Sequence, residues 1–345
     1  MRPTRKLMLL ALLIFIGAAA LLAGSLYIGA TRWRSPVAAE VEIRPGSSVR
    51  AIALELARNR VIGTPKLFEI IARGRGLART LRAGTYEFPA GMTMSQVLAK
   101  IARGEVKQYA FTIVEGWTIN EIKAALSAQP FLNGSSMPEE FVKLATDPAV
   151  IQELGFEGMK TLEGYLFPDT YLIAKPFDPK AFIKRLVARF REVWAALDAN
   201  AIAASNMSQR QIITIASVVE KETGAAQERP LIASVFFNRL RQNMPLQSDP
   251  TTIYGLPNFD GNLHKQDMLN PHPYNTYMHP GLPPGPICNP GKASIDAVIH
   301  PARSDYLYFV AKGDGTHQFS STLGEHLAAV KEYQIEPARA ARNNQ

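Results

Sequence analysis

The sequence predicts an α+β protein with three parts: a single N-terminal transmembrane helix, a small α+β module and a larger mixed α+β domain. An uncharged run opens the chain, one strand–glycine–helix pattern recurs three times, and helical periodicity with a closing hairpin fills the remainder. The expected boundaries are a cytoplasmic tail at 1–6, an anchor at 7–28, a linker at 29–40, the module at 41–107, the larger domain at 108–337 and a disordered tail at 338–345.

The apolar run begins after three basic residues and is long enough to cross a bilayer. Residues 7–28 carry no charge, and about 20 apolar residues span the hydrocarbon core as a helix. A cleaved signal peptide has a shorter apolar core, roughly 7–15 residues, although the small residues at 18–20 and 23–25 leave cleavage open. Basic residues before the run favour a cytoplasmic N-terminus, a bias that Arg32 and Arg34 weaken. We therefore expect a single-pass protein of the cytoplasmic (inner) membrane with its larger domain on the periplasmic, extracytoplasmic side.

Composition restricts the classes of partner and chemistry. A net charge of +8 on an exported chain fits an anionic surface such as phospholipid or a cell-wall polymer. Nucleic acid is not expected, because no dense basic run interleaved with aromatics is present. Cys288 is the single cysteine, so an internal disulfide is impossible. We expect no metal site and no serine-triad hydrolase, since neither a HExxH spacing nor a G-x-S-x-G elbow occurs.

The small module is built from a unit that the chain uses three times. Each copy is a strand end, a glycine turn and a hydroxyl residue at an N-cap position, namely Ser48, Thr93 and Thr118. Gln96 and Glu121 complete capping boxes in two of the copies. The first unit continues through Thr64-Pro65, a helix cap with proline at the first helical position, into a second helix and a returning strand at 82–88. This order resembles a LysM-type glycan-binding module, and a generic spacer domain is the open alternative.

The larger domain reads as mostly helical with a small closing hairpin. We expect helices near 118–128, 138–145, 179–197, 208–221 and 228–242, then a helix at 293–299, strands at 306–311 and 316–320, and a final helix at 322–333. Residues 271–291 are rich in proline and glycine, which is typical of a flexible linker. Because periodic structure resumes directly afterwards, an ordered loop is the better interpretation, and functional groups concentrate in such loops.

One helix of this domain ends in carboxylates. Residues 212–219 are apolar around nearly the whole circumference, so the helix is buried, and Glu220 and Glu222 follow at its end. A carboxyl at such a position loses hydration, and its pKa rises, as a general acid requires. The alternative is that both carboxylates only solvate the helix end.

Other segments combine aromatic rings with amides and carboxylates, as sugar-binding clefts do. They lie around 162–171, 246–255 and 273–277. For Tyr165, Phe167 and Tyr171 we expect core packing for at least two of the three.

From about residue 40 to 335, the chain resembles the endolytic murein transglycosylase family, also called YceG-like. The motifs that carry the resemblance are LEGYLFPDTY from Leu162, ASVVEKET from Ala216, VFFNRL from Val235, LQSDPTTIYG from Leu246, PYNTY from Pro273, GLPPGPI from Gly281 and HPA…YLYFVA from His300. Two positions are atypical: Cys288 stands where a small residue is expected, and a Pro-His-Pro sequence precedes Tyr274.

The resemblance implies cleavage of the β-1,4 bond between N-acetylmuramic acid and N-acetylglucosamine within peptidoglycan strands, without a cofactor. The glutamate carried over is Glu220, which first protonates the glycosidic oxygen and then accepts the proton of the muramic acid 6-hydroxyl, giving a 1,6-anhydro end. Glu222 is the backup candidate, on a different face of the helix. The expected substrate-binding residues are Glu163, Gln247, Asp249, Tyr254, Asn275, Thr276 and Tyr277.

Within that set, Glu163 and Asp249 are expected to orient the substrate or Glu220. Asn275, Thr276 and Tyr277 are expected to line the glycan cleft opposite the Glu220 helix, and the alternative is that Asn275 only caps a turn and Tyr277 only packs. By resemblance, such enzymes end nascent strands, so peptidoglycan synthases are expected partners besides the glycan strands and the membrane.

Two other functions remain open from the sequence. A hydrolytic muramidase would use Glu220 as the acid, with Asp249 or Glu163 holding a water or acting as nucleophile. A non-catalytic cell-wall-binding scaffold would leave glycan chains unaltered and would still bind them after Glu220→Gln.

Overall fold

A computed structural model describes residues 5–257, 259–337 and 339. The expected tails at 1–6 and 338–345 lie mostly outside the described residues. The chain forms two compact units, one of residues 1–110 with 172–177 and one of residues 111–171 with 178–345. The chain passes between them in β3 (Gln108–Thr112) and β4 (Thr170–Ala174), which pair as a two-stranded sheet.

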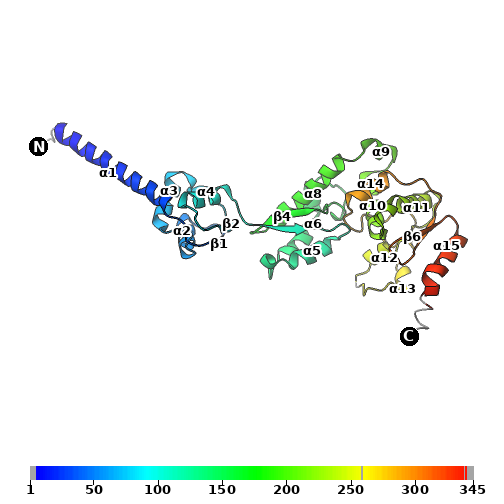
Figure 1. Ribbon diagram of the computed structural model, residues 1–345. Helices are drawn as coiled ribbons and strands as arrows, with labels where there is room; N and C mark the ends of the chain where they lie inside the picture. The colour runs from blue at the N-terminus through cyan, green and yellow to red at the C-terminus, as the bar shows by residue number, and fades with distance from the viewer. Residues whose placement is uncertain (1–4, 258, 338, 340–345) are drawn as a thin grey trace. The chain divides into compact units, whose positions relative to one another are not determined.

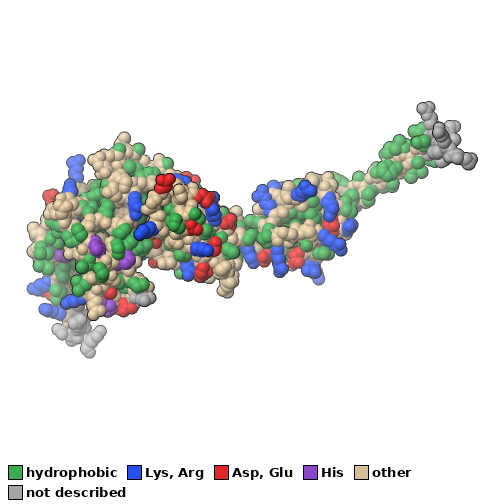
Figure 2. All heavy atoms as spheres, turned by 180° about the vertical axis from the view of Figure 1, so that it is seen from behind, with side chains coloured by type: hydrophobic (Ala, Val, Ile, Leu, Met, Phe, Trp, Pro, Cys, Tyr) green, Lys and Arg blue, Asp and Glu red, His purple; other side chains and the backbone are tan. Residues whose placement is uncertain are grey.

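The first unit opens with α1 (Arg5–Arg32), the helix that the uncharged run predicts. Met8–Gly29 is apolar and long enough to cross a membrane, and none of this stretch is buried inside the protein. Figure 2 shows hydrophobic side chains covering this helix. At its end the chain packs closely onto the module: Trp33 lies against Gly63, where a Cβ atom would overlap the indole ring.

The module itself has a two-stranded antiparallel sheet and three short helices (Figure 1). Strand β1 (Ala39–Ile43) pairs with β2 (Gly84–Phe88), with Val41 opposite Tyr86. The remaining elements are α2 (Val49–Arg58), α3 (Pro65–Gly74), a 3-10 turn (Leu77–Arg79) and α4 (Met94–Arg103). Leu56, Phe68, Tyr86 and Leu98 are fully buried in its core. The strand, helix, helix, strand order is as expected, and a LysM-type function for it stays a prediction.

The helix caps that the sequence predicts are formed. Ser48, Thr93 and Thr118 each accept a hydrogen bond from a backbone N–H three residues on, and Thr93 and Thr118 form full capping boxes with Gln96 and Glu121. Thr64 is the exception. It occupies the N-cap position before Pro65, but its side chain makes no capping bond, so proline alone starts α3 there.

The second unit is helical around its core, with a short hairpin near its end (Figure 1). Its helices are α5 (Ile119–Ser127), α6 (Met137–Ala145), α7 (Pro148–Glu153), α8 (Pro179–Ala195), α9 (Ala199–Ala204), α10 (Gln209–Glu222), α11 (Arg229–Arg241), α12 (Asp249–Tyr254), α13 (Lys265–Met268), α14 (Lys292–Ile299) and α15 (Leu323–Val330). Short 3-10 turns cover Pro130–Leu132 and Ala226–Glu228, and a π turn, Lys331–Ile335, extends α15. Strands β5 (Tyr308–Ala311) and β6 (His317–Ser320) pair antiparallel, with Phe309 opposite Phe319.

The long helices and the hairpin lie where the sequence predicts them, whereas α7, α9, α12 and α13 were not expected. These four helices have six residues or fewer, too short for helical periodicity to show. The core-packing prediction is confirmed for all three aromatic residues of the 162–171 segment, which are buried. Tyr165 lies between Phe156 and Phe190, with ring centroids 4.6 and 5.0 Å away.

Candidate active site

Helix α10 is the buried centre of the second unit. A capping box of Ser208 and Gln211 starts it, and every residue from Ile212 to Val219 is buried. Ser217, a buried polar residue of this helix, donates to the Thr214 carbonyl and accepts from the backbone N–H of Ile287, which ties the helix to the segment before α14. The helix therefore carries its last turn, with two carboxylates, to a defined place in the fold.

Glu220 is held by the protein itself. Its side chain is only 7% exposed and forms an ion pair with Arg229, with 3.3 Å between Oε1 and Nη2. The backbone N–H of Gly291 donates to Oε2 over 2.9 Å. Arg229 is fixed in turn by Ser294, to which its Nε donates. Both oxygens thus already accept a hydrogen bond from a group of the protein itself.

The carboxylate of Glu115 lies close to Gly291 and interacts with both Glu220 and Arg229. A Cβ atom on Gly291 would overlap the Glu115 carboxyl, so glycine is what allows their close approach. Desolvation and the charge of Glu220 raise the pKa of Glu115, and Arg229 opposes that rise. Sequence reasoning did not select Glu115 as a functional candidate, because it lies in the strand–glycine–cap pattern and reads there as a turn residue.

Glu222 has different surroundings. The hydroxyl of Ser248 donates to Glu222 Oε1 over 2.5 Å. Burial raises the pKa of Glu222 to about 7, with the charge of Asp249 adding to the rise and the Ser248 hydrogen bond opposing it. A carboxyl that titrates near neutrality can give up a proton and take one back at physiological pH.

Glu222 also borders a cavity of about 460 Å³, which we call the Glu222 cavity. Three residues selected from the sequence line it with Glu222: Gln247, Asp249 and Tyr277. The Tyr277 hydroxyl donates to Asp249 Oδ1 over 2.5 Å, and burial together with this bond raises the pKa of Tyr277. Residues from the PYNTY and LQSDPTTIYG motifs thus meet the end of the ASVVEKET helix at one cavity.

Other walls of the Glu222 cavity come from residues that sequence reasoning missed. Arg239 is buried, donates through Nη1 to the Leu246 carbonyl and Gln247 Oε1, and lies over the Tyr308 ring at 5.0 Å. His317 and His326 line the same cavity. Arg239 and Tyr308 lie within the VFFNRL and YLYFVA motifs, so membership in a motif could have marked them as site residues. Nothing else in the sequence distinguishes Arg239 from a surface cation or Tyr308 from a core aromatic residue.

Asn275 and Thr276 organise the loop that carries Tyr277. Asn275 is 1% exposed, and its amide donates to the carbonyls of Met268 and Asn270 over 3.0 and 2.8 Å. Its Oδ1 accepts from the Thr252 hydroxyl and the Tyr277 N–H. The Thr276 hydroxyl accepts from the Ser248 N–H over 3.0 Å. The proline- and glycine-rich segment is therefore an ordered loop here, and substrate contact by Asn275 and Thr276 stays a prediction.

Glu163 and Tyr254 lie in another cluster and do not line the Glu222 cavity. Glu163 is 3% exposed and accepts from the Ile119 N–H, the Asn289 amide and the Tyr254 hydroxyl. Burial raises its pKa to about 8. These contacts join the start of α5 to the segment before α14, and a substrate role for the two residues stays a prediction.

Comparison with known proteins defines the class. A model of the YceG-like family matches residues 41–332, and the chain belongs to that family. It is 34% identical to the endolytic murein transglycosylase of Bacillus subtilis, covering 87% of this chain and 86% of that protein. It is 30% identical to the protein of the same name from Streptococcus pneumoniae, covering 85% of this chain but 58% of that longer protein. The crystal structure of a YceG-like protein from Listeria monocytogenes matches with a TM-score of 0.58 and 33% identity, over 84% of this chain and 98% of that one.

Among the described residues, no group of three or more histidine, cysteine or carboxylate side chains could hold a metal ion.

Proposed function

We propose that this chain is a membrane-anchored endolytic murein transglycosylase whose general acid and base is Glu222. Murein transglycosylase activity as such follows from its family and from relatives that carry this name, which makes it a cell-wall lyase. The observation that supports Glu222 is its cavity: a carboxyl with a pKa near 7 faces an open space together with Gln247, Asp249 and Tyr277.

In the proposed reaction a muramic acid residue binds with its glycosidic oxygen against Glu222. The carboxyl gives its proton to that oxygen as the bond from C1 to it breaks. The carboxylate then takes the proton from the 6-hydroxyl as O6 bonds to C1, so a 1,6-anhydro ring closes and Glu222 is protonated again. No water is consumed, and one carboxyl can serve both steps because its pKa lies near the working pH.

Glu220, the first choice from the sequence, stays a competing assignment. Its two oxygens already accept hydrogen bonds from Arg229 and Gly291, whereas Glu222 borders a cavity. A general acid must contact the glycosidic oxygen of the substrate, so a carboxyl that lines a cavity is the better candidate, and this difference favours Glu222. In this arrangement Glu220 and Arg229 hold the end of α10 and thereby position Glu222.

Product mass tests the reaction. Purified sacculi digested with the protein should release fragments with anhydromuramic ends, one water lighter than the reducing ends that a hydrolytic muramidase would leave. Fragments with reducing ends would establish hydrolysis, and unaltered strands that still bind the protein would establish a scaffold.

Location needs a separate experiment. A chain of residues 31–345 should remain soluble and still cleave peptidoglycan, because α1 supplies attachment and not chemistry. Recovery of the full-length protein with membranes, intact at its N-terminus, is expected. If the protein is instead found cut near residue 25 and released from membranes, the N-terminal helix is a signal peptide and not an anchor. An extracytoplasmic active site and a synthase partner are part of the same proposal and rest on the family alone.

A further inference from the structure

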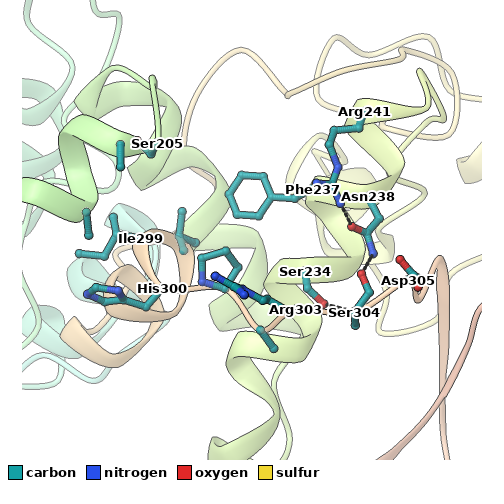
Figure 3. Close-up of a pocket in the computed structure, with 15 residues that line it drawn as sticks. Ser205, Ser234, Phe237, Asn238, Arg241, Ile299, His300, Arg303, Ser304 and Asp305 are labelled. Carbon is teal, nitrogen blue, oxygen red and sulfur yellow. Dashed lines mark hydrogen bonds between the residues drawn. The ribbon is translucent and has the colours of Figure 1, made fainter.

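A second cavity of this unit is larger than the one beside Glu222. It has a volume of about 860 Å³ and lies between α9, α11 and the segment after α14 (Figure 3). This volume is in the range of ligand-binding pockets, roughly 300–1,000 Å³. None of the site residues selected from the sequence lines it, although the His300-Pro301-Ala302 motif does. We call it the α11 cavity.

The α11 cavity combines an aromatic ring with cations. The Phe237 ring projects from α11 into it, opposite the side formed by Ser205 and Ile299 (Figure 3). Arg241 and Arg303, both exposed, lie on its walls. Arg303 makes no ion pair or hydrogen bond among the described residues, so its full set of donors faces solvent. Guanidinium groups with free donors bind carboxylates in bidentate fashion, and the ring offers an apolar surface beside them.

Most of the other polar groups of the wall already have partners. His300 lies 3.6 Å from Asp198, which does not line the cavity. Among the lining residues, Asp305 is the one with a carboxylate. The hydroxyls of Ser234 and Ser304 share a hydrogen bond of 2.7 Å. Arg241 donates to Asn238, which leaves the rest of its guanidinium available. Two arginines against one carboxylate leave the cavity wall with an excess of positive charge.

Helix α11 connects this cavity to the Glu222 cavity. Phe237, Asn238 and Arg241 border the α11 cavity, whereas Phe236 and Arg239 border the other. Asn238 donates to the carbonyls of Ser304 and Tyr306, over 2.9 and 2.8 Å, and the neighbouring Arg239 donates to that of Leu307 over 2.7 Å. One helix thus clamps one continuous segment that forms a wall of both cavities.

We propose that the α11 cavity binds the carboxylates of a peptidoglycan peptide stem through Arg303 and Arg241, with Phe237 against the stem or its sugar. This assignment rests on the proposed murein transglycosylase function. A stem held there fixes the position of the glycan that enters the Glu222 cavity. The site then sets substrate preference, and the chemistry remains at Glu222.

The test compares two substrates with the full chain in detergent: uncrosslinked glycan strands that carry stems, and the same strands after an amidase has removed them. Arg303→Glu should raise KM for stem-bearing strands about tenfold, the size expected for loss of a charge-assisted contact. Its kcat, its KM for stem-free strands and its melting temperature should stay unchanged. Arg241→Ala should act in the same direction. Lys143→Glu makes the same charge change at an exposed position of α6 outside the described cavities, and should change neither KM.

Two results would overturn the assignment. An equal rise in KM for both substrates would mean that the arginines bind the glycan backbone or act through the fold. No change with either substrate would mean that the cavity has no part in substrate binding. Failure of the wild-type protein to cut any strand would instead refute the proposed function, and stem binding could still be measured by titrating wild-type protein with both kinds of strand.

Discussion

Glu220 and Glu222 leave the same last turn of α10 and enter opposite environments. Glu220 is almost buried and is bound on both oxygens, by the Arg229 guanidinium and the Gly291 N–H. Glu222 accepts one hydrogen bond, from the Ser248 hydroxyl, and it lines a cavity together with Asp249 and Tyr277. The first environment gives both oxygens of the carboxylate a donor, and the second raises the pKa of a carboxyl that borders a cavity. The comparison teaches that two carboxylates of one helical turn can differ in the partners of their oxygens, and the proposal of Glu222 as the acid depends on that difference.

The largest expected effect separates the two carboxylates directly. Glu222→Gln keeps the shape of the side chain and can still accept a hydrogen bond from the Ser248 hydroxyl, but the amide has no proton that it can transfer to substrate. Turnover should fall by about 10⁴-fold, the upper end for an acid–base group, because one residue fills both roles. The melting temperature should stay within about 2 °C, and initial rates of anhydro-product release give the measurement.

Glu220→Gln is the matched variant, and it should show the reverse pattern. It removes the charge that faces Arg229, whose side chain is 15% exposed, and this costs about 2–3 kcal/mol of the free energy of unfolding. Turnover of the folded fraction should fall less than tenfold. If Glu220→Gln abolishes cleavage while keeping its stability, and Glu222→Gln remains active, then Glu220 is the acid, as the sequence first indicated.

The pH profile sharpens the comparison through the surroundings of Glu222. The reaction starts from the protonated carboxyl, so kcat/KM should be level below pH 7 and fall about tenfold per pH unit above it, or about 100-fold at pH 9. Asp249→Asn removes a charge that raises the pKa and should move the fall to lower pH. Ser248→Ala removes a hydrogen bond that lowers the pKa and should move it to higher pH. A profile that neither substitution moves would contradict the assignment.

Tyr277→Phe tests the cavity wall. The variant loses one hydroxyl, which donates to Asp249, so the folded state should lose little and melt within about 2 °C of the wild type. Turnover should fall about tenfold, because Asp249 is freed to move and the hydroxyl no longer faces the cavity. Early melting with full activity would show that Tyr277 only packs.

Asn275→Ala has the smallest expected effect on chemistry and a large one on the loop. Its amide makes hydrogen bonds with groups of Met268, Asn270, Thr252 and Tyr277, and the loss of these bonds should cost about 3 kcal/mol. Turnover of the folded fraction, measured well below the new melting temperature, should stay within threefold. A variant that melts normally but turns over slowly would instead support the direct sugar contact expected from the sequence.

The amino-acid sequence determined the local structure of this protein. The uncharged run defined α1, the residues at N-cap positions marked where α2, α4 and α5 begin, and the apolar run 212–219 predicted the burial of α10. These features depend on near neighbours along the chain, whose side chains and backbone groups meet at fixed helical spacing. The ordered motifs also indicated the family before any tertiary contact was considered.

Only the tertiary structure decided which groups share a site. Residues 220 and 222 are two positions apart, which is about 200° around a helix, so they face nearly opposite sides. Which side meets a cavity depends on how α11, α12 and the 271–291 loop pack against α10. Arg239 reads as a surface cation at the end of a helix, yet packing buries it beside Tyr308 in the wall of the Glu222 cavity. A pKa near 7 arises in the same way, because desolvation and the charge of Asp249 exist only after segments distant in the sequence have come together.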